Sequence, residues 1–286
     1  MTEAVFVTDL HGKMPRYLSL FKYLRERPPE ILFIGGDLLP PFMPGSDSLH
    51  HGDTDFIHNY LMANFLSLHK DLGDDYPKVV MIMGNDDPRY FESSLISAGN
   101  NLWVYLHQRK LNWNKYDLFG YSFVPPTPFY LKDWERYDVS RFTDLGCISP
   151  EEGRRSFPTS ENDRKWTTIK DDLDSLALEM APGSSIFLFH SPPYKTLLDK
   201  GDLKGQKIDH VLLDEHLGSI AIKRFIEERQ PLLTLHGHIH ESARMTGSWL
   251  EKIGSTVCIN GSHDGDELSV IRLTLEQPEY AQRLLL

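Results

Sequence analysis

The chain has 286 residues, and its 40% hydrophobic and 25% charged side chains are typical of an ordinary soluble globular protein. The formal charge of −11, from 41 acidic and 30 basic residues, argues against non-specific binding to nucleic acid or anionic membranes. Two distant cysteines, Cys147 and Cys258, form no disulfide framework. We see no signal peptide and no apolar run of the roughly 18 residues that a membrane span needs. We therefore expect a cytoplasmic protein, and its oligomeric state stays unknown.

Short apolar runs alternate with helical patterns in the first half of the chain. Residues 4–8, 31–36 and 78–84 are compact and apolar, as buried strands are. Residues 16–26 and 54–70 place large apolar side chains near helical spacing. This order predicts βαβ units around a largely parallel sheet.

The middle of the chain is less regular, because residues 120–166 contain many helix and strand breakers and no sustained period. A stretch of this length in a compact domain is usually a functional loop region. The elements expected after it are a helix near 163–180, a strand at 184–190, a helix from about Ser219 to Arg229, and strands at 231–237, 255–260 and 267–275. We expect a single domain over residues 1–286, with loop excursions at about 38–53 and 120–166.

Most predicted strands are followed by residues that can bind a metal ion, namely Asp9, His11, Asp37, Asn85, Asp86, His190, His238 and His240. Ligands of open α/β sheets bind beyond the carboxyl ends of the strands, so these side chains should gather at one edge. Each residue alone has an ordinary explanation as a helix cap, a turn residue or a buried histidine. Together they would be costly to bring together without a cation.

The chemistry of these donors narrows the choice of metal. Oxygen and imidazole ligands without cysteine suit Mn, Fe, Zn, Ni or Co. The donors also outnumber what one tetrahedral ion needs, so we expect two divalent metal ions that share a bridging carboxylate. His236 precedes the glycine of "HGHIH", and we expect it in the core or behind the ligands.

The ordered motifs "DLH" (9–11), "GD" (36–37), "GNDD" (84–87), "FHSPP" (189–193) and "GHIH" (237–240) resemble those of the calcineurin-like metallophosphoesterase superfamily. The resemblance implies an α/β fold, a four-layer α-β-β-α sandwich. Two central mixed β-sheets would be flanked by helices, with the metal site at the strand carboxyl ends.

The resemblance also implies a ligand set and a reaction. Asp9, His11 and His240 would hold one metal, Asn85, His190 and His238 would hold the second, and Asp37 would bridge them. The reaction would be hydrolysis of a small-molecule phosphoester by in-line attack of a metal-bridging hydroxide. A phosphodiester is favoured over a monoester, and manganese is one candidate metal.

One position departs from the family pattern. The third motif usually carries a histidine that serves the leaving group, and here that position is Asp86, followed by Asp87. We expect both aspartates to be catalytic, although a carboxylate beside two metals should be ionised and a poor proton donor. The enzyme would then prefer good leaving groups or recruit another acid. The candidate acids are His50, His51, His58 and His263.

Three arginines are candidates for substrate binding: Arg89, Arg154 and Arg155. For Arg89 a surface salt bridge is the favoured alternative, and for Arg154 and Arg155 a solvated charge run is an equally good explanation. Two other functions remain open on the same fold. One is a non-catalytic metal-binding scaffold, which the complete set of expected ligands disfavours. The other is a nuclease, which would need the 120–166 excursion to form a basic groove.

Overall fold

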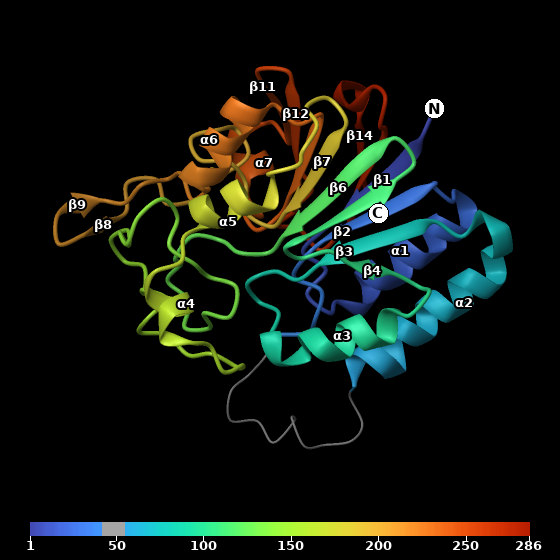
Figure 1. The fold of residues 1–286 in the computed structure, drawn as a ribbon, viewed down its shortest axis with the longest axis horizontal. Coiled ribbons are helices and arrows are strands. Elements are labelled where there is room, and N and C mark those ends of the chain that lie inside the picture. Colours follow the sequence, from blue (N-terminus) through green and yellow to red (C-terminus); the bar gives the residue numbers. More distant parts are fainter. Residues whose placement is uncertain (42–54) are drawn as a thin grey trace.

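The computed structural model describes residues 1–41 and 55–286, which build two six-stranded β-sheets lying face to face with helices on both outer faces (Figure 1). The first sheet contains β1 (Glu3–Val7), β2 (Ile31–Gly35), β3 (Lys78–Ile82), β4 (Val104–Tyr105), β13 (Ser269–Thr274) and β14 (Gln282–Leu285). The second sheet contains β5 (Arg109–Trp113), β6 (Tyr116–Tyr121), β7 (Ser185–Phe189), β10 (Leu233–His236), β11 (Leu250–Ile253) and β12 (Thr256–Asn260). A short hairpin, β8 (Lys207–Ile208) and β9 (Val211–Leu212), projects from the body.

Helices cover the two outer faces. The first sheet is covered by α1 (Met14–Glu26), the π-helical segment η2 (Phe56–Met62), α2 (Ala63–Leu72) and α3 (Glu92–Gly99). The second sheet is covered by α5 (Ile169–Leu176), α6 (Ile220–Arg229) and α7 (Ser242–Thr246), and α4 (Glu161–Lys165) lies farther out. The short helical turns are η3 (Gly73–Asp75), η4 (Arg89–Phe91) and η5 (Pro278–Tyr280). The predicted four-layer α-β-β-α sandwich is confirmed.

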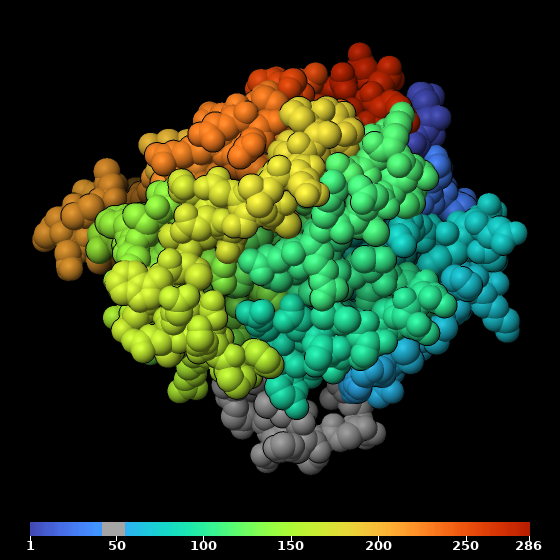
Figure 2. Space-filling view, in the orientation of Figure 1, coloured from blue at the N-terminus to red at the C-terminus, as the bar shows by residue number. Residues whose placement is uncertain are grey.

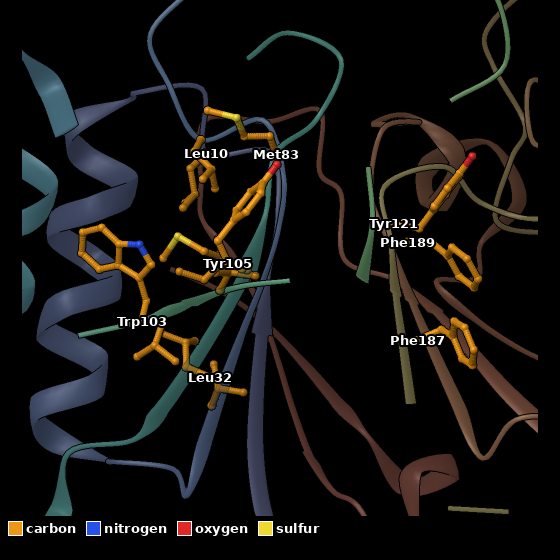
Figure 3. Close-up of a cluster of buried hydrophobic side chains, with 14 of the residues drawn as sticks. Leu10, Leu32, Met83, Trp103, Tyr105, Tyr121, Phe187 and Phe189 are labelled. Carbon is orange, nitrogen blue, oxygen red and sulfur yellow. The ribbon is translucent and has the colours of Figure 1, made fainter. Parts of the chain in front are cut away.

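Both faces of the central strands are buried, and the alternation of side chains along each strand separates two cores. In β1, Ala4 and Phe6 point into the core between the sheets, whereas Val5 and Val7 face the helices. Figure 3 shows part of the outer core, with Trp103 on the helix side of the first sheet and Phe187 beyond the second. This double burial explains why the strands appear in the sequence as continuous apolar runs.

The sheets are mixed. Strands β1 to β4 are parallel neighbours, and β13 and β14 continue the same sheet in antiparallel fashion. In the second sheet β6, β7, β10 and β12 are parallel, with antiparallel β5 and β11 at the edges. The expected parallel arrangement therefore holds for the central strands only.

Most of the expected elements exist, with two differences. The helix expected near 163–180 is two short helices, α4 and α5, because residues 166–168 break the helical hydrogen bonding. Strand β6 occupies the start of the 120–166 excursion, which therefore begins inside the second sheet. His50, His51 and most of the 38–53 excursion lie outside the described residues. The extent of the single domain stays a prediction.

Residues 125–156, named the lobe below, are irregular but held together (Figure 2, yellow-green). The amide of Lys132 donates to the carbonyl of Arg154, whose own amide donates to the carbonyl of Tyr130. The ammonium of Lys132 pairs with Glu135 at 2.5 Å, and both side chains are fully buried. Across the two described ranges, no helix is long and apolar enough to cross a membrane.

Candidate metal centre

The predicted ligands follow the carboxyl ends of five parallel strands. Asp9 and His11 come after β1, and Asp37 comes after β2. Asn85 comes after β3, His190 directly follows β7, and the last two histidines come after β10. Because the two sheets stack with these ends on the same side, side chains from distant parts of the sequence meet there.

Four of these side chains form a compact cluster. Each offers one ligand atom, and the four atoms lie within 4.8 Å of one another; the residues are Asp9, His11, Asp37 and His240. The Nε2 atoms of His11 and His240 are 3.2 Å apart. Nε2 of His240 is also 3.3 Å from a carboxylate oxygen of Asp9.

The remaining predicted ligands adjoin this cluster through Asp37. Nε2 of His190 lies 3.3 Å from Oδ2 of Asp37 and 3.0 Å from Oδ1 of Asn85. Nδ1 of His190 lies 2.8 Å from the carbonyl oxygen of Gly35. The ring of His238 is 5.3 Å from that of His190, and its amide donates to Asp9 at 3.1 Å. All seven predicted ligands are thus brought to one place.

The backbone at this site is strained. Asp9, His11, Asp37 and His238 have φ angles of 56°, 48°, 51° and 72°. Positive φ is uncommon for residues with a side chain, and it persists where the surrounding structure enforces it. Four of the seven predicted ligands therefore have an unfavourable backbone conformation, which the surrounding structure maintains in order to place their side chains.

Two glycines allow the strand ends to approach the cluster. A Cβ on Gly84 would lie 2.3 Å from Oδ1 of Asp37 and 2.5 Å from Cε1 of His190. A Cβ on Gly237 would lie 2.3 Å from Oγ1 of Thr8. The glycines of the "GND" and "GHIH" motifs therefore serve close packing around the ligands.

The charges of the cluster compensate one another. Burial by itself would raise the pKa of Asp9, but His240, His190 and His11 hold that pKa well below its usual value. Burial likewise opposes ionisation of Asp37, and His190 outweighs it to lower the pKa of Asp37. Burial also opposes the charged form of His190, but Asp37 and Asp9 raise the pKa of His190 to about 10.

The donor set fits a divalent cation. The Gly35 carbonyl fixes the proton of His190 on Nδ1, which leaves Nε2 directed at two oxygens, where a cation or a proton must sit. The facing Nε2 atoms of His11 and His240, 3.2 Å apart, are placed to share a proton or a cation. Carboxylate oxygens, imidazole nitrogens and an amide oxygen together form a ligand set for Mn, Fe, Zn, Ni or Co.

Asp86 borders the cluster and is half exposed. Its amide donates to Oδ1 of Asp37 at 2.8 Å, and its own carboxylate accepts from the side-chain amide of Asn85 at 2.9 Å. Its second oxygen is 3.5 Å from Nδ1 of His11. Burial, followed by the charge of Asp37, raises the pKa of Asp86 to about 7. The protein alone thus shifts this pKa opposite to the direction expected from bound cations.

Asp87 is surrounded by backbone amides. Its buried carboxylate accepts hydrogen bonds from the amides of Leu38, Leu39 and Gly84, at 2.7–3.0 Å. Both oxygens are therefore occupied by the loops that follow Asp37 and precede Asn85. Sequence reasoning grouped Asp87 with the catalytic residues, but its surroundings are those of a residue that positions these two loops.

The predicted substrate arginines are mostly engaged elsewhere. Arg89 pairs with Glu92 at 3.0 Å and lies over the ring of Trp134. Arg155 donates to the carbonyls of Lys132 and Pro150, so it fastens the lobe. Arg154 is exposed, with its guanidinium 5.9 Å from the ring centre of Tyr130.

Two of the histidines considered as alternative acids, His58 and His263, lie within the described residues, and both have acidic partners. His58 pairs with Asp55, and His263 lies 3.2 Å from Glu267. His236 is fully buried, with its ring nitrogens at the carbonyl of Ser191 and the hydroxyl of Thr234. It therefore belongs to the core, as expected.

Two residues that the sequence did not predict, Ser262 and Arg16, hold Asp9 in place. The hydroxyl of Ser262 donates to Oδ2 of Asp9 at 2.6 Å, and the buried guanidinium of Arg16 donates to its carbonyl at 2.5 Å. Ser262 comes just after the predicted strand at 255–260, so the rule that identified the other polar residues could have found it. Arg16 carries no such signal, because it lies inside a helix.

Solved structures of low sequence identity share this fold. One crystal structure aligns with a TM-score of 0.59 at 15% identity, covering 99% of this chain and 98% of its own. TT1561 of Thermus thermophilus aligns with a TM-score of 0.55 at 15% identity, over 99% of this chain and 98% of that one. Phosphopantetheinyl hydrolase (PptH) from Mycobacterium tuberculosis aligns with a TM-score of 0.50 at 12% identity, over 98% and 95%. Identities this low show the fold alone.

Sequence comparison identifies the family. No curated protein sequence matches this chain at a significant level. The family model described as calcineurin-like phosphoesterase matches residues 3–242, which include every predicted metal ligand. The chain belongs to the calcineurin-like phosphoesterase family.

Proposed function

We propose that this protein is a dinuclear-metal phosphoesterase that hydrolyses small-molecule phosphoesters, with phosphodiesters favoured over monoesters. The proposal depends above all on the cluster of Asp9, His11, Asp37 and His240, whose ligand atoms lie within 4.8 Å of one another. His190 and Asn85 adjoin Asp37 on its other side, which gives that carboxylate the central position.

The proposed ligand sets follow from these contacts and from the family motifs. Asp9, His11 and His240 form the first set. Asn85, His190 and His238 form the second set, and Asp37 bridges the two. Bound divalent ions would supply an activated water and neutralise charge on the phosphoryl oxygens. The protein contributes orientation, because the carbonyl of Gly35 fixes the ring of His190 and the amide of Asp86 fixes Asp37.

Two observations support a diester substrate. Asp86 replaces the usual histidine, and bound cations would keep its carboxylate ionised, which makes it an acceptor of the hydrogen bond from Asn85 and a poor proton donor. A leaving group that departs without protonation then reacts best. In addition, Arg89 and Arg155 are engaged by the protein, so neither offers its charge to a doubly charged monoester.

The direct test is hydrolysis of bis-p-nitrophenyl phosphate and of p-nitrophenyl phosphate by purified protein with Mn²⁺, Ni²⁺, Co²⁺ or Zn²⁺. We expect metal-dependent turnover, with a higher kcat/KM for the diester. Absence of turnover on both substrates with all four metals would instead favour the non-catalytic scaffold.

Substitution of the bridging residue tests the ligand assignment. Asp37→Ala should lower kcat by more than about 100-fold, because both proposed sites lose a shared ligand. Asp71→Ala is the matched control, since Asp71 lies on the surface, where it pairs with Arg25 at 2.8 Å and accepts from the hydroxyl of Ser67 at 3.5 Å. Circular dichroism should show that both variants fold. Full metal-dependent activity in Asp37→Ala would disprove the bridging role.

A further inference from the structure

The lobe contacts the chain segment that follows the "GND" motif. The indole Nε1 of Trp134 donates to the carbonyl of Asp87 at 2.8 Å. Next along the chain, the amide of Arg89 donates to Asp133 at 2.8 Å, and the amide of Tyr90 donates to Ser156 at 2.9 Å. Three consecutive lobe contacts therefore fix the main chain just beyond Asn85 and Asp86.

The lobe is a rigid support for these contacts. The ring of Trp134 is fully buried, 4.9 Å from the ring of His107 and 5.6 Å from that of Phe123. The carboxylate of Asp133 is buried and also accepts from the amide and hydroxyl of Ser156. Because both side chains are buried and closely packed, they cannot move without displacing their neighbours in the core.

Asp87 connects the lobe to the proposed metal ligands. Its carbonyl accepts from Trp134, while its carboxylate holds the amides of Leu38 and Gly84. Leu38 follows Asp37, and Gly84 precedes Asn85. A displacement of the Asp87 main chain would therefore shift the proposed bridging ligand and one ligand of the second set together.

We propose that Trp134 is a positioning residue for the metal centre, and that the lobe serves as a buttress for the loops carrying Asp37 and Asn85. The inference rests on the proposed function where activity is measured. It also predicts a change in metal affinity, which can be measured without catalysis. Groups that orient metal ligands commonly contribute 10- to 100-fold to affinity or activity.

The variant Trp134→Phe removes the indole N–H and keeps an aromatic ring in place. We expect its affinity for Mn²⁺, measured by titration calorimetry, to fall about tenfold. We also expect kcat for bis-p-nitrophenyl phosphate to fall about tenfold with little change in KM. The matched control is Trp103→Phe, because Trp103 is also buried and its Nε1 donates to the carbonyl of Leu95 at 3.0 Å.

The control separates positioning from general stability. Both variants lose a buried hydrogen bond and should unfold at a lower temperature, but only Trp134→Phe should lose Mn²⁺ affinity. Equal Mn²⁺ affinity in Trp134→Phe and Trp103→Phe would overturn the inference, as would a wild-type protein that binds no Mn²⁺. Wild-type protein that binds Mn²⁺ without turnover would contradict the proposed function, and the titration would still decide this inference.

A second variant is used if Trp134→Phe does not fold. Asp133→Asn weakens the contacts of the lobe with Arg89 and within the lobe with Ser156, and the same results are expected for it.

Discussion

At the scale of single residues, Asp86 distinguishes this site from the family pattern. Its carboxylate lies between the side-chain amide of Asn85 and Nδ1 of His11, so it contacts one residue from each proposed ligand set. A carboxylate in this place orients neighbouring ligands. A histidine there would instead offer a proton to a leaving group.

Substitution of Asp86 by histidine should therefore broaden the leaving groups that the enzyme accepts. We predict that Asp86→His raises kcat/KM for phenyl phosphate by about tenfold or more, because general acid catalysis then assists a poor leaving group. The activity on bis-p-nitrophenyl phosphate should change little. Asp86→Asn, which adds no acid, is the control. An unchanged rate on phenyl phosphate would remove the support for the leaving-group hypothesis.

His107 is a second residue with a testable property, and it lies in the core. Its Nδ1 accepts from the amide of Ser122 at 3.0 Å. Within the described residues, its Nε2 is buried without a hydrogen-bond partner. Burial, together with Arg89, Arg136 and Arg109, holds the pKa of His107 well below 6.5. The residue is therefore neutral in the folded protein and protonates on unfolding at acidic pH.

The sign of the resulting pH dependence follows from this difference. The contribution of His107 to stability is fully present above its unfolded pKa of about 6.5 and is lost as the pH falls below it, by up to about 1.4 kcal/mol per pH unit. We predict that His107→Asn, which keeps an acceptor for Ser122, gives a shallower loss of unfolding free energy between pH 6.5 and 5. Urea denaturation measures this slope. Identical slopes in the two proteins would contradict the assignment.

At the scale of elements, the lobe is fastened to helix α6. Asp138, from the segment of the lobe that follows Trp134, accepts hydrogen bonds from the hydroxyl of Ser219 and from the amides of Ile220 and Ala221. These groups form the amino end of α6. The helix end is thus capped by a residue about 80 positions earlier in the chain, which ties that segment to the second sheet's covering helices.

Removal of this cap should destabilise the protein. We predict that Asp138→Ala lowers the free energy of unfolding by about 2 kcal/mol, because three donors lose a charged acceptor. Thr168→Ala removes the cap of α5, a hydroxyl that accepts from the amide of Asp171 and donates to its carboxylate, and should cost less, about 1 kcal/mol. Urea denaturation compares the two variants. An equal or larger loss in Thr168→Ala would show that Asp138 does not anchor α6.

At the scale of the whole molecule, the metal centre joins the two sheets. Asp9 and Asp37 come from the first sheet, whereas His190 and His240 come from the second. Ions bound between them would link the two halves of the sandwich. They would therefore stabilise the folded protein relative to an unfolded chain in which the ligands are dispersed.

Metal removal should consequently lower the unfolding temperature. A metal at 100 times its Kd adds about 2.7 kcal/mol per site, which corresponds to several degrees in a protein of this size. We predict that Mn²⁺ raises Tm over protein treated with a chelator, as measured by differential scanning calorimetry. The increase should shrink in Asp37→Ala. A Tm that does not depend on Mn²⁺ would contradict a centre that bridges the sheets.

The sequence by itself determined the central strands and the family. Strands β1, β2, β3, β7 and β10 are short apolar runs followed by polar residues, a local signal that needs no knowledge of packing. The ordered motifs from Asp9 to His240 carried the resemblance. The short antiparallel edge strands β5 and β11 escaped detection, because exposed residues such as Arg109 and Lys252 interrupt their apolar pattern.

Tertiary structure alone decided how the ligands are held. The contact between Asp9 and Ser262 joins residues 253 positions apart, and that between Trp134 and Asp87 joins residues 47 apart. Local propensity and spacing carry no information about such pairs, because the packing of the sheets and the lobe creates them. The sequence thus predicted which residues could bind metal, and only the packing showed Asp87 facing backbone amides and Trp134 holding it in place.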